Sequence, residues 1–393
     1  MRLPVTRLGR VLAPNVGIAL LRGSQLLILA LLARSEPEIR SALLTGFGLI
    51  AAFSMLFGEG AGLYILGVDR SRLTRKVLAR SMVVQAITTT VGMTAGVALA
   101  LAVSGEARLK VVVALAALAL TTAIEGLTRA AKAPLLVLGR DGIYGLIDLV
   151  LGTAKVILLA VGLFQGSLLV LVILPLPGLA GLMVTTRWVV RRLPGGQPAP
   201  AGLTREILTI GLAGALSAGY SQAPVLVGSV LLPLHAAALL AASTRIVQAM
   251  EFIPGTFSLQ VMPRLRTWRH SWQKAYGAFL LLGAAMALVA YLFRPLLEAF
   301  ARVELNLVPV FGLLLLTFVI KSGNLFLTAR LLVLWSPRVR MVVCAVIDVV
   351  ALGLTVAGSA VAGLTGIAGA AVAIESAFAG LALLAMQRIR PRG

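Results

Sequence analysis

The chain has 393 residues, of which 59% are hydrophobic and 12% are charged, and its mean hydropathy is +1.00. A soluble protein cannot bury this much apolar surface, so the composition predicts a polytopic α-helical membrane protein. The formal net charge of +21 would suit a nucleic-acid-binding protein. However, the basic residues lie in short connections between apolar runs, as the positive-inside rule requires, and this excludes nucleic acid as a partner.

Twelve apolar runs are long enough to cross a bilayer as helices. We predict spans at residues 11–32, 42–66, 77–103, 109–138, 143–164, 167–190, 206–231, 236–262, 275–293, 305–334, 339–361 and 365–386. An even number of spans places both termini on the same side, and the basic ends predict that this side is the cytoplasm.

The predicted spans form two repeats. Residues 191–205 are rich in Pro, Gly and Arg, so they predict a cytoplasmic linker between an N-terminal lobe (1–190) and a C-terminal lobe (206–393). A shift of 196 residues carries each of the first six spans onto one of the last six, and it places Glu125 on Lys321. Because a shift by six spans preserves orientation, we expect two six-helix lobes related by a pseudo-twofold axis along the membrane normal.

Two segments carry a family resemblance. Residues 56–76, LFGEGAGLYILGVDRSRLTRK, form a glycine-punctuated apolar end that runs into a basic loop. Residues 231–266, LLPLHAAALLAASTRIVQAMEFIPGTFSLQVMPRLR, end in a proline and a basic cluster. With the paired six-span layout and the basic linker, these segments resemble the polysaccharide-repeat (Wzx-type) flippases of the multidrug/oligosaccharidyl-lipid/polysaccharide (MOP) exporter superfamily. The lipid II flippases of this superfamily usually carry two further helices, so twelve spans favour the polysaccharide branch.

The resemblance implies a function at the bacterial cytoplasmic membrane. The chain would move an undecaprenyl-pyrophosphate-linked oligosaccharide from the inner to the outer leaflet by alternating access of its two lobes. Coupling to a proton or sodium gradient, or to the membrane potential, is implied as well. We expect a monomer without a cofactor or bound metal, whose partners are the lipid-linked saccharide and the membrane.

Charged residues inside the spans are the candidate site residues, because ionisable groups at bilayer depth are costly and usually functional. Arg22 lies in the first span and Arg245 in the eighth, one in each lobe. Guanidinium groups bind phosphate oxygens bidentately and stay charged, so both are candidate ligands for the pyrophosphate. The resemblance adds that lipid II flippases use cavity arginines on the first and eighth helices. The alternative is neutralisation within each lobe, although the six-residue separation of Arg245 and Glu251 suits such a pair poorly.

Further charges allow more than one interpretation. Lys155 and Asp148 share one face of the fifth span, and Lys155 could bind the cargo or pair with a neighbour. Glu125 has the spacing for an intrahelical pair with Arg129. It could instead form a salt bridge between the lobes with Lys321, which would act as a gate.

Several carboxylates are candidates for proton or cation coupling, because a desolvated carboxylate titrates near neutral pH. These are Glu59, Glu125 and Glu251 together with Asp348 and Glu375, and a buried structural carboxyl is the alternative for each. The glycines around Glu59 and at 211–214 lie in apolar helices, so we interpret them as packing glycines. Pro224 is a candidate hinge, because the seventh span lines the opening in the superfamily that this chain resembles.

Two other functions compete with the flippase. A cation-coupled multidrug or small-molecule exporter of the same superfamily would be expected to carry a carboxylate in the first span, where this chain has only Arg22. A membrane-embedded glycan ligase, polymerase or acyltransferase would need a catalytic loop outside the membrane. The predicted external connections are too short for one, so we expect a transporter rather than an enzyme.

Overall fold

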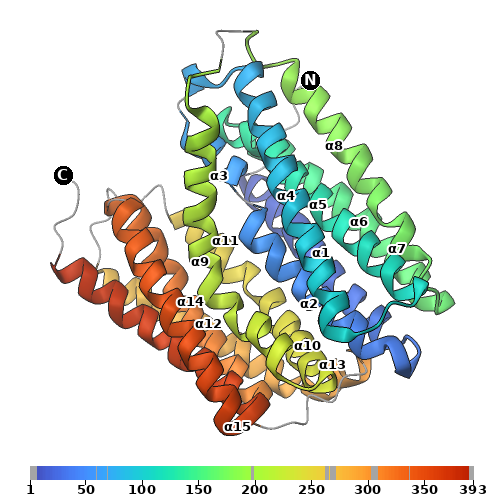
Figure 1. Ribbon diagram of the computed structural model, residues 1–393. Coiled ribbons are helices and arrows are strands. Elements are labelled where there is room, and N and C mark those ends of the chain that lie inside the picture. The colour runs from blue at the N-terminus through green and yellow to red at the C-terminus, as the bar shows by residue number, and fades with distance from the viewer. Residues whose placement is uncertain are drawn as a thin grey trace. The chain divides into compact units, whose positions relative to one another are not determined.

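A computed structural model describes residues 7–58, 60–68, 70–195, 199–261, 265, 271–301, 309–335 and 337–388, apart from some side chains such as that of Arg22. Every regular element in these ranges is helical (Figure 1). The chain divides into two compact units, Met1–Ala215 and Leu216–Gly393, and the boundary lies inside helix α9 (Leu203–Leu231). The predicted all-helical, multi-pass fold class is confirmed.

Unit 1 is a helical bundle in which α4, α5 and α6 run beside one another (Figure 1). Its elements are α1 (Arg7–Ala33), α2 (Pro37–Phe57), α3 (Gly60–Gly67), the 3-10 turn η1 (Arg70–Arg72), α4 (Arg75–Ser104), α5 (Leu109–Val137), α6 (Asp141–Gln165), α7 (Val170–Ile173), α8 (Pro175–Val190) and the first part of α9. Capping interactions fix where some of these helices begin and end. The Thr74 side chain accepts a hydrogen bond from the Val77 N–H at the start of α4, and Gly166 with φ of 64° ends α6.

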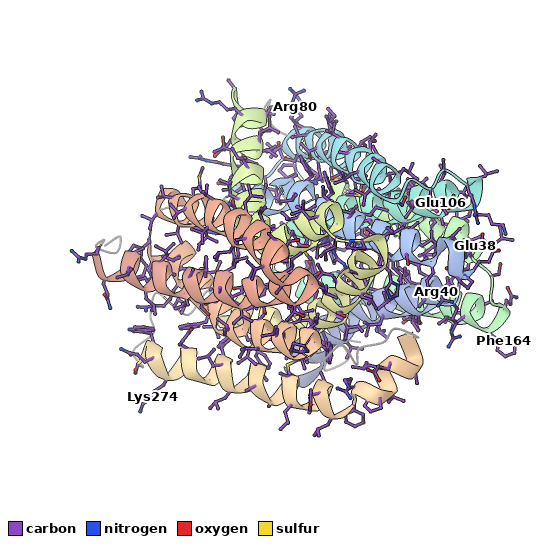
Figure 2. All side chains as sticks on the ribbon, turned by 60° about the horizontal axis from the view of Figure 1, so that its bottom comes forward. Glu38, Arg40, Arg80, Glu106, Phe164 and Lys274 are labelled. Atoms are coloured by element: carbon purple, nitrogen blue, oxygen red, sulfur yellow. The ribbon has the colours of Figure 1, made fainter. Side chains whose placement is uncertain are left out.

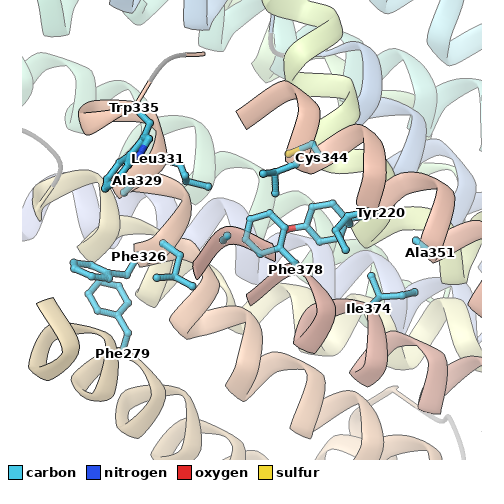
Figure 3. Close-up of a cluster of buried hydrophobic side chains, with 14 of the residues drawn as sticks. Tyr220, Phe279, Phe326, Ala329, Leu331, Trp335, Cys344, Ala351, Ile374 and Phe378 are labelled. Carbon is cyan, nitrogen blue, oxygen red and sulfur yellow. The ribbon is translucent and has the colours of Figure 1, made fainter. Parts of the chain in front are cut away.

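Unit 2 begins with the second part of α9. It continues through α10 (Leu234–Met250), α11 (Phe252–Val261), α12 (Trp272–Leu292), α13 (Arg294–Ala301), α14 (Val310–Leu334) and α15 (Pro337–Arg388). An aromatic core holds it together: Tyr220 stacks on Phe378 with ring centroids 5.1 Å apart, and Phe279 meets Phe326 at 5.6 Å (Figure 3). The first contact ties α9 to α15, and the second ties α12 to α14.

The helices follow the predicted spans closely. Among the described residues, eight helices are long and apolar enough to cross a membrane, or up to ten if each of two bent pairs is one span. Each predicted span falls on a helix, a helix pair or half of α15, which is broken at Ala362 and Gly363. The second span is interrupted between α2 and α3 after Phe57, and the sixth consists of α7 and α8. The eighth is interrupted at Glu251, where the helix axis bends by 41° between α10 and α11.

Helix boundaries repeat along the chain with the same shift as the sequence. A shift of 196 residues carries α6, residues 141–165, onto 337–361, where the first half of α15 ends. It carries α1, residues 7–33, onto 203–229 within α9. The breaks in the second and eighth spans lie at nearly equivalent places. Hence the repeat extends from the apolar pattern to where the helices begin and end.

The two glycine strings noted in the sequence pack against each other inside unit 1. A Cβ atom added to Gly60 would lie 2.9 Å from the Gly211 Cα and 3.3 Å from the Ile207 carbonyl oxygen. A side chain at Gly60 would therefore collide with the backbone of α9, whereas a Cβ atom at Gly211 would lie at an ordinary 3.5 Å from the Gly60 Cα. The structure thus confirms that Gly60 and Gly211 are packing glycines.

Replacing Gly60 with leucine should therefore push α3 away from α9. We expect a loss of about 1–3 kcal/mol in the free energy of unfolding, which is typical of overpacking, measured by unfolding in detergent micelles. Gly67→Ala is the matched control, because a Cβ atom there would meet no atom within 4 Å. An unchanged stability of the Gly60 variant would contradict the close packing.

Candidate functional site

Unit 2 contains a buried ionic cluster around Lys321. The Lys321 Nζ on α14 lies 2.9 Å from Oε1 of Glu251, at the junction of α10 and α11. One turn along α14, the Asn324 amide donates to the Glu375 Oε2 at 2.7 Å and to the Glu375 carbonyl oxygen at 2.8 Å. The cluster thus joins α14 to the break between α10 and α11 and to the second half of α15.

Arg245 lies in the same unit but has a different hydrogen-bond partner. Its side chain is only 2% exposed, and its Nη1 donates to the Gln248 Oε1 at 2.6 Å. Gln248 lies one turn after Arg245 on α10, and Glu251 follows at the C-terminal end of this helix. The alternative in which Glu251 neutralises Arg245 gives way to a pair between Glu251 and Lys321.

A small cavity adjoins this cluster. Its volume is about 40 Å³, and its polar lining includes Gln248, Glu251, Lys321 and Glu375. A cavity needs roughly 10–15 Å³ of such space to hold one water molecule, so this one has room for a few water molecules or a small cation. In this conformation the cluster can serve an ion or a proton, and Arg245 does not line the cavity.

Pro224, the candidate hinge, also lines this cavity, in the second part of α9. The two apolar parts of this helix are Leu203–Leu216 and Ala218–Leu231. The break between them therefore comes before Pro224, and the hinge role of Pro224 stays a prediction.

Unit 1 contains a second set of ion pairs, between α5 and α6, in which Glu125 is 32% exposed and the other three side chains are buried. Lys155 donates to Glu125, and Lys132 donates to Asp148. On each helix the acid comes seven residues, or two turns, before the base, and because the two helices run antiparallel the acid of each meets the base of the other. Lys132 and Asp148 are 3% and 2% exposed, and the Lys132 ammonium lies 4.0 Å from the centroid of the Tyr144 ring. The result is a two-rung ladder of opposite charges.

These ion pairs bear on the roles that the sequence left open for Lys155, Glu125 and Lys321. Lys155, a candidate cargo ligand, has a carboxylate partner in this conformation. Glu125 and Lys321, the candidate gate, each have an ion-pair partner within their own unit. Lys132 was missed in the sequence, although its position inside an apolar span was the available signal.

Two candidates lie outside the described part of the chain: Glu59, and the side chain of Arg22. The backbone on either side of Glu59 is held by one side chain. Gln85 accepts from the Ala61 N–H at 3.0 Å and donates to the Phe57 carbonyl oxygen at 3.2 Å. The coupling role of Glu59 and the phosphate role of Arg22 stay predictions.

Exposed ion pairs at one end of unit 1 do not form a comparable site. Figure 2 shows Glu38 and Glu106 at this end. Lys110 Nζ lies 2.8 Å from the Glu36 Oε1, and its hydrogen bond holds the pKa of Glu36 below the ordinary value. Arg108 Nη1 lies 2.5 Å from Glu38. Because these groups are exposed to solvent, the pairs contribute little to stability.

Comparisons with known proteins identify the fold. No family model matches the chain, and no curated protein sequence does. Among solved structures, a mutant of the Vibrio cholerae MATE transporter VcmN superposes with a TM-score of 0.61 at 15% identity, over 97% of this chain and 95% of that one. The inward-facing conformation of a multidrug resistance MATE family transporter of the MOP superfamily gives 0.60 at 14%, over 96% and 94%.

A MATE protein in complex with MaL6 gives a TM-score of 0.56 at 15% identity, over 98% of both chains. Sequence identities this low establish the fold but not the cargo or the mechanism. The similarity nevertheless extends over nearly the whole of each chain, so it covers both halves of the repeat. The chain is therefore a multi-pass membrane protein with the two-lobed, all-helical fold of the MATE transporters of the MOP superfamily.

Proposed function

We propose that the chain is a transporter that moves an undecaprenyl-pyrophosphate-linked oligosaccharide across the bacterial cytoplasmic membrane. The fold supports a transporter with alternating access. The observation that carries the choice of an anionic cargo is Arg245, whose guanidinium is 2% exposed inside an apolar span and donates to the neutral amide of Gln248. Long cationic side chains at this depth are costly, and a cargo phosphate is a partner that could recover the cost.

The contacts suggest how the cargo would be bound. Arg245 is buried and donates to Gln248 one turn away, so it must leave this position to reach a pyrophosphate. The break between α10 and α11, which follows Arg245 by six residues, allows such a movement without unfolding either helix. Arg22, on the first span, would supply the second guanidinium.

The cluster of unit 2 would couple transport to an ion gradient. A proton or a sodium ion that binds Glu251 or Glu375 competes with Lys321 for the carboxylate. Because Lys321 joins α14 to the break between α10 and α11, loss of its ion pair would loosen this break. Binding of the ion would thus favour the conformation in which Arg245 is released.

A reconstituted system tests the cargo directly. In proteoliposomes with a fluorescent polyprenyl-pyrophosphate-linked saccharide, Arg245→Ala should lower flipping at least about tenfold, equivalent to 1.4 kcal/mol or more. Arg245→Lys should retain part of it, because lysine keeps the charge but loses bidentate geometry. Lys274→Ala, at an exposed position in the same unit, is the control (Figure 2). Normal flipping by a correctly inserted Arg245→Ala protein would remove Arg245 from the site.

A cation-coupled multidrug exporter is the second candidate. It is favoured by the carboxylates buried in both units, Asp148 and Glu375, and by solved structures of this fold whose names include multidrug resistance. The same proteoliposomes distinguish the two. Gradient-driven movement of a cationic dye such as ethidium, without movement of the lipid-linked saccharide, would favour the exporter.

A further inference from the structure

The break between α2 and α3 is closed by one side chain from α4. Gln85 is 1% exposed, and both ends of its amide are used. Its Oε1 accepts from the Ala61 N–H at 3.0 Å, while its Nε2 donates to the Phe57 carbonyl oxygen at 3.2 Å and to the Thr89 Oγ1 at 2.8 Å. Backbone polar groups freed by a helix break at membrane depth need partners within the protein. Gln85 supplies them at this break.

A cavity of about 190 Å³ lies beside this break, within unit 1. It is bounded by the junction of α2 and α3, by α4 and by the first part of α9, and most of its lining is apolar. Among the described residues that line it, the polar side chains are Gln85, bonded as above, and Thr88, whose hydroxyl donates to the Gln85 carbonyl oxygen at 3.1 Å. The polar groups at the cavity wall are therefore already engaged with the protein.

Such a cavity favours hydrocarbon over water. A buried water molecule needs two to four polar partners, and an apolar cavity of about 150 Å³ in another protein stays dry and binds benzene. The cavity of unit 1 is somewhat larger and similarly poor in available polar partners. Its occupant should accordingly be a hydrocarbon group of several carbon atoms.

The helix α4, which lines the cavity, also carries apolar surface that is left uncovered. Only 28% of the most apolar stretch of α4 is buried within the protein. Val83, Ile87 and Val91 follow one another at intervals of one turn and are 51%, 60% and 58% exposed. In a membrane-spanning helix such a stripe faces lipid. Because Val84, Gln85 and Thr88 of the same helix line the cavity, its nearest source of hydrocarbon is the surrounding bilayer.

We propose that the cavity of unit 1 binds one acyl chain of a membrane phospholipid, which enters beside α4 and fills the space next to the Gln85-closed break. This site is independent of the cargo, since a flippase and a drug exporter would both be surrounded by phospholipid.

Photolabelling tests the site. The protein is reconstituted in vesicles of phosphatidylethanolamine and phosphatidylglycerol that include a phospholipid with a diazirine in one acyl chain. After irradiation, we expect labelled peptides from the cavity wall, around Thr88 in α4 and Ala215 in α9. Thr88→Phe and, separately, Ala215→Phe should each reduce labelling of the opposite wall at least fivefold. Ile87→Phe, on the exposed stripe of the same helix, should leave it unchanged.

Three results would overturn the proposal. The first is labelling confined to the exposed stripe of α4. The second is labelling of the cavity wall that neither filling variant reduces, for variants that unfold like the parent protein. The third is displacement of the label by polyprenyl phosphate but not by excess unlabelled phospholipid, which would assign the cavity to the lipid of the cargo.

Discussion

Replacing Lys132 with methionine is expected to lower the free energy of unfolding by about 3–5 kcal/mol, the cost of breaking a buried ion pair by removal of one partner. Asp148 is 2% exposed and receives its hydrogen bond from Lys132. Methionine preserves much of the volume of the lysine stem, so the expected loss is electrostatic rather than a cavity effect. The contact between the ammonium and the Tyr144 ring would be lost as well.

The controls separate the buried charge from packing. The double variant with Lys132→Met and Asp148→Leu removes both charges, and its stability should return to within roughly 1–2 kcal/mol of the parent, because apolar replacements of buried pairs are often neutral. Lys110→Met removes the exposed partner of Glu36 and should change stability by less than about 1 kcal/mol. Unfolding in detergent micelles gives all three values. If the double variant is as unstable as Lys132→Met, the unpaired charge of Asp148 is not the cause of the lost stability.

Replacing Glu251 with glutamine is expected to reduce gradient-driven transport at least about tenfold, equivalent to 1.4 kcal/mol or more. The substitution keeps the shape of the side chain but removes the carboxylate that faces Lys321 at 2.9 Å. Lys321 is then left with Glu375 as the remaining carboxylate of the cluster. The break between α10 and α11 would lose the charge that responds to an ion.

Initial rates in proteoliposomes, with and without a proton or sodium gradient, measure this effect. Glu298→Gln is the matched control, because Glu298 pairs with Arg294 at 3.7 Å within α13, away from the Lys321 cluster. The variant with both Glu251→Gln and Lys321→Met should restore downhill movement of the cargo without dependence on the gradient. Full gradient dependence in Glu251→Gln would exclude Glu251 from coupling.

The fold could be predicted largely from the sequence, because the bilayer restricts the options. Backbone polar groups in hydrocarbon must bond within each segment, so an apolar run of sufficient length has to be a helix. The repeat was visible for the same reason, since it is carried by the lengths of these runs. The breaks at Phe57 and Glu251 were not predicted, because the stabilising partners come from elsewhere in the chain: Gln85 for the first and Lys321 for the second.

The candidate site was less predictable. Sequence spacing placed Glu125 near Arg129 on one helix and suggested Lys321 as a partner in the other lobe. The structure pairs Glu125 with Lys155 and Lys321 with Glu251. Each observed pair joins different helices within its own unit. Spacing along a single helix carries no information on the rotation and depth at which neighbouring helices meet.

The sequence by itself determined the class of protein, the spans and the depth of each intramembrane charge, because hydropathy and helix rise are local quantities. Only the tertiary structure decided which charges meet, since a pair such as Lys132 and Asp148 forms from two helices whose packing is set by the rest of unit 1. It also decided that Arg245 is buried beside Gln248 rather than at a cavity wall. Burial depends on what surrounds a side chain, and spacing along one helix does not reveal this.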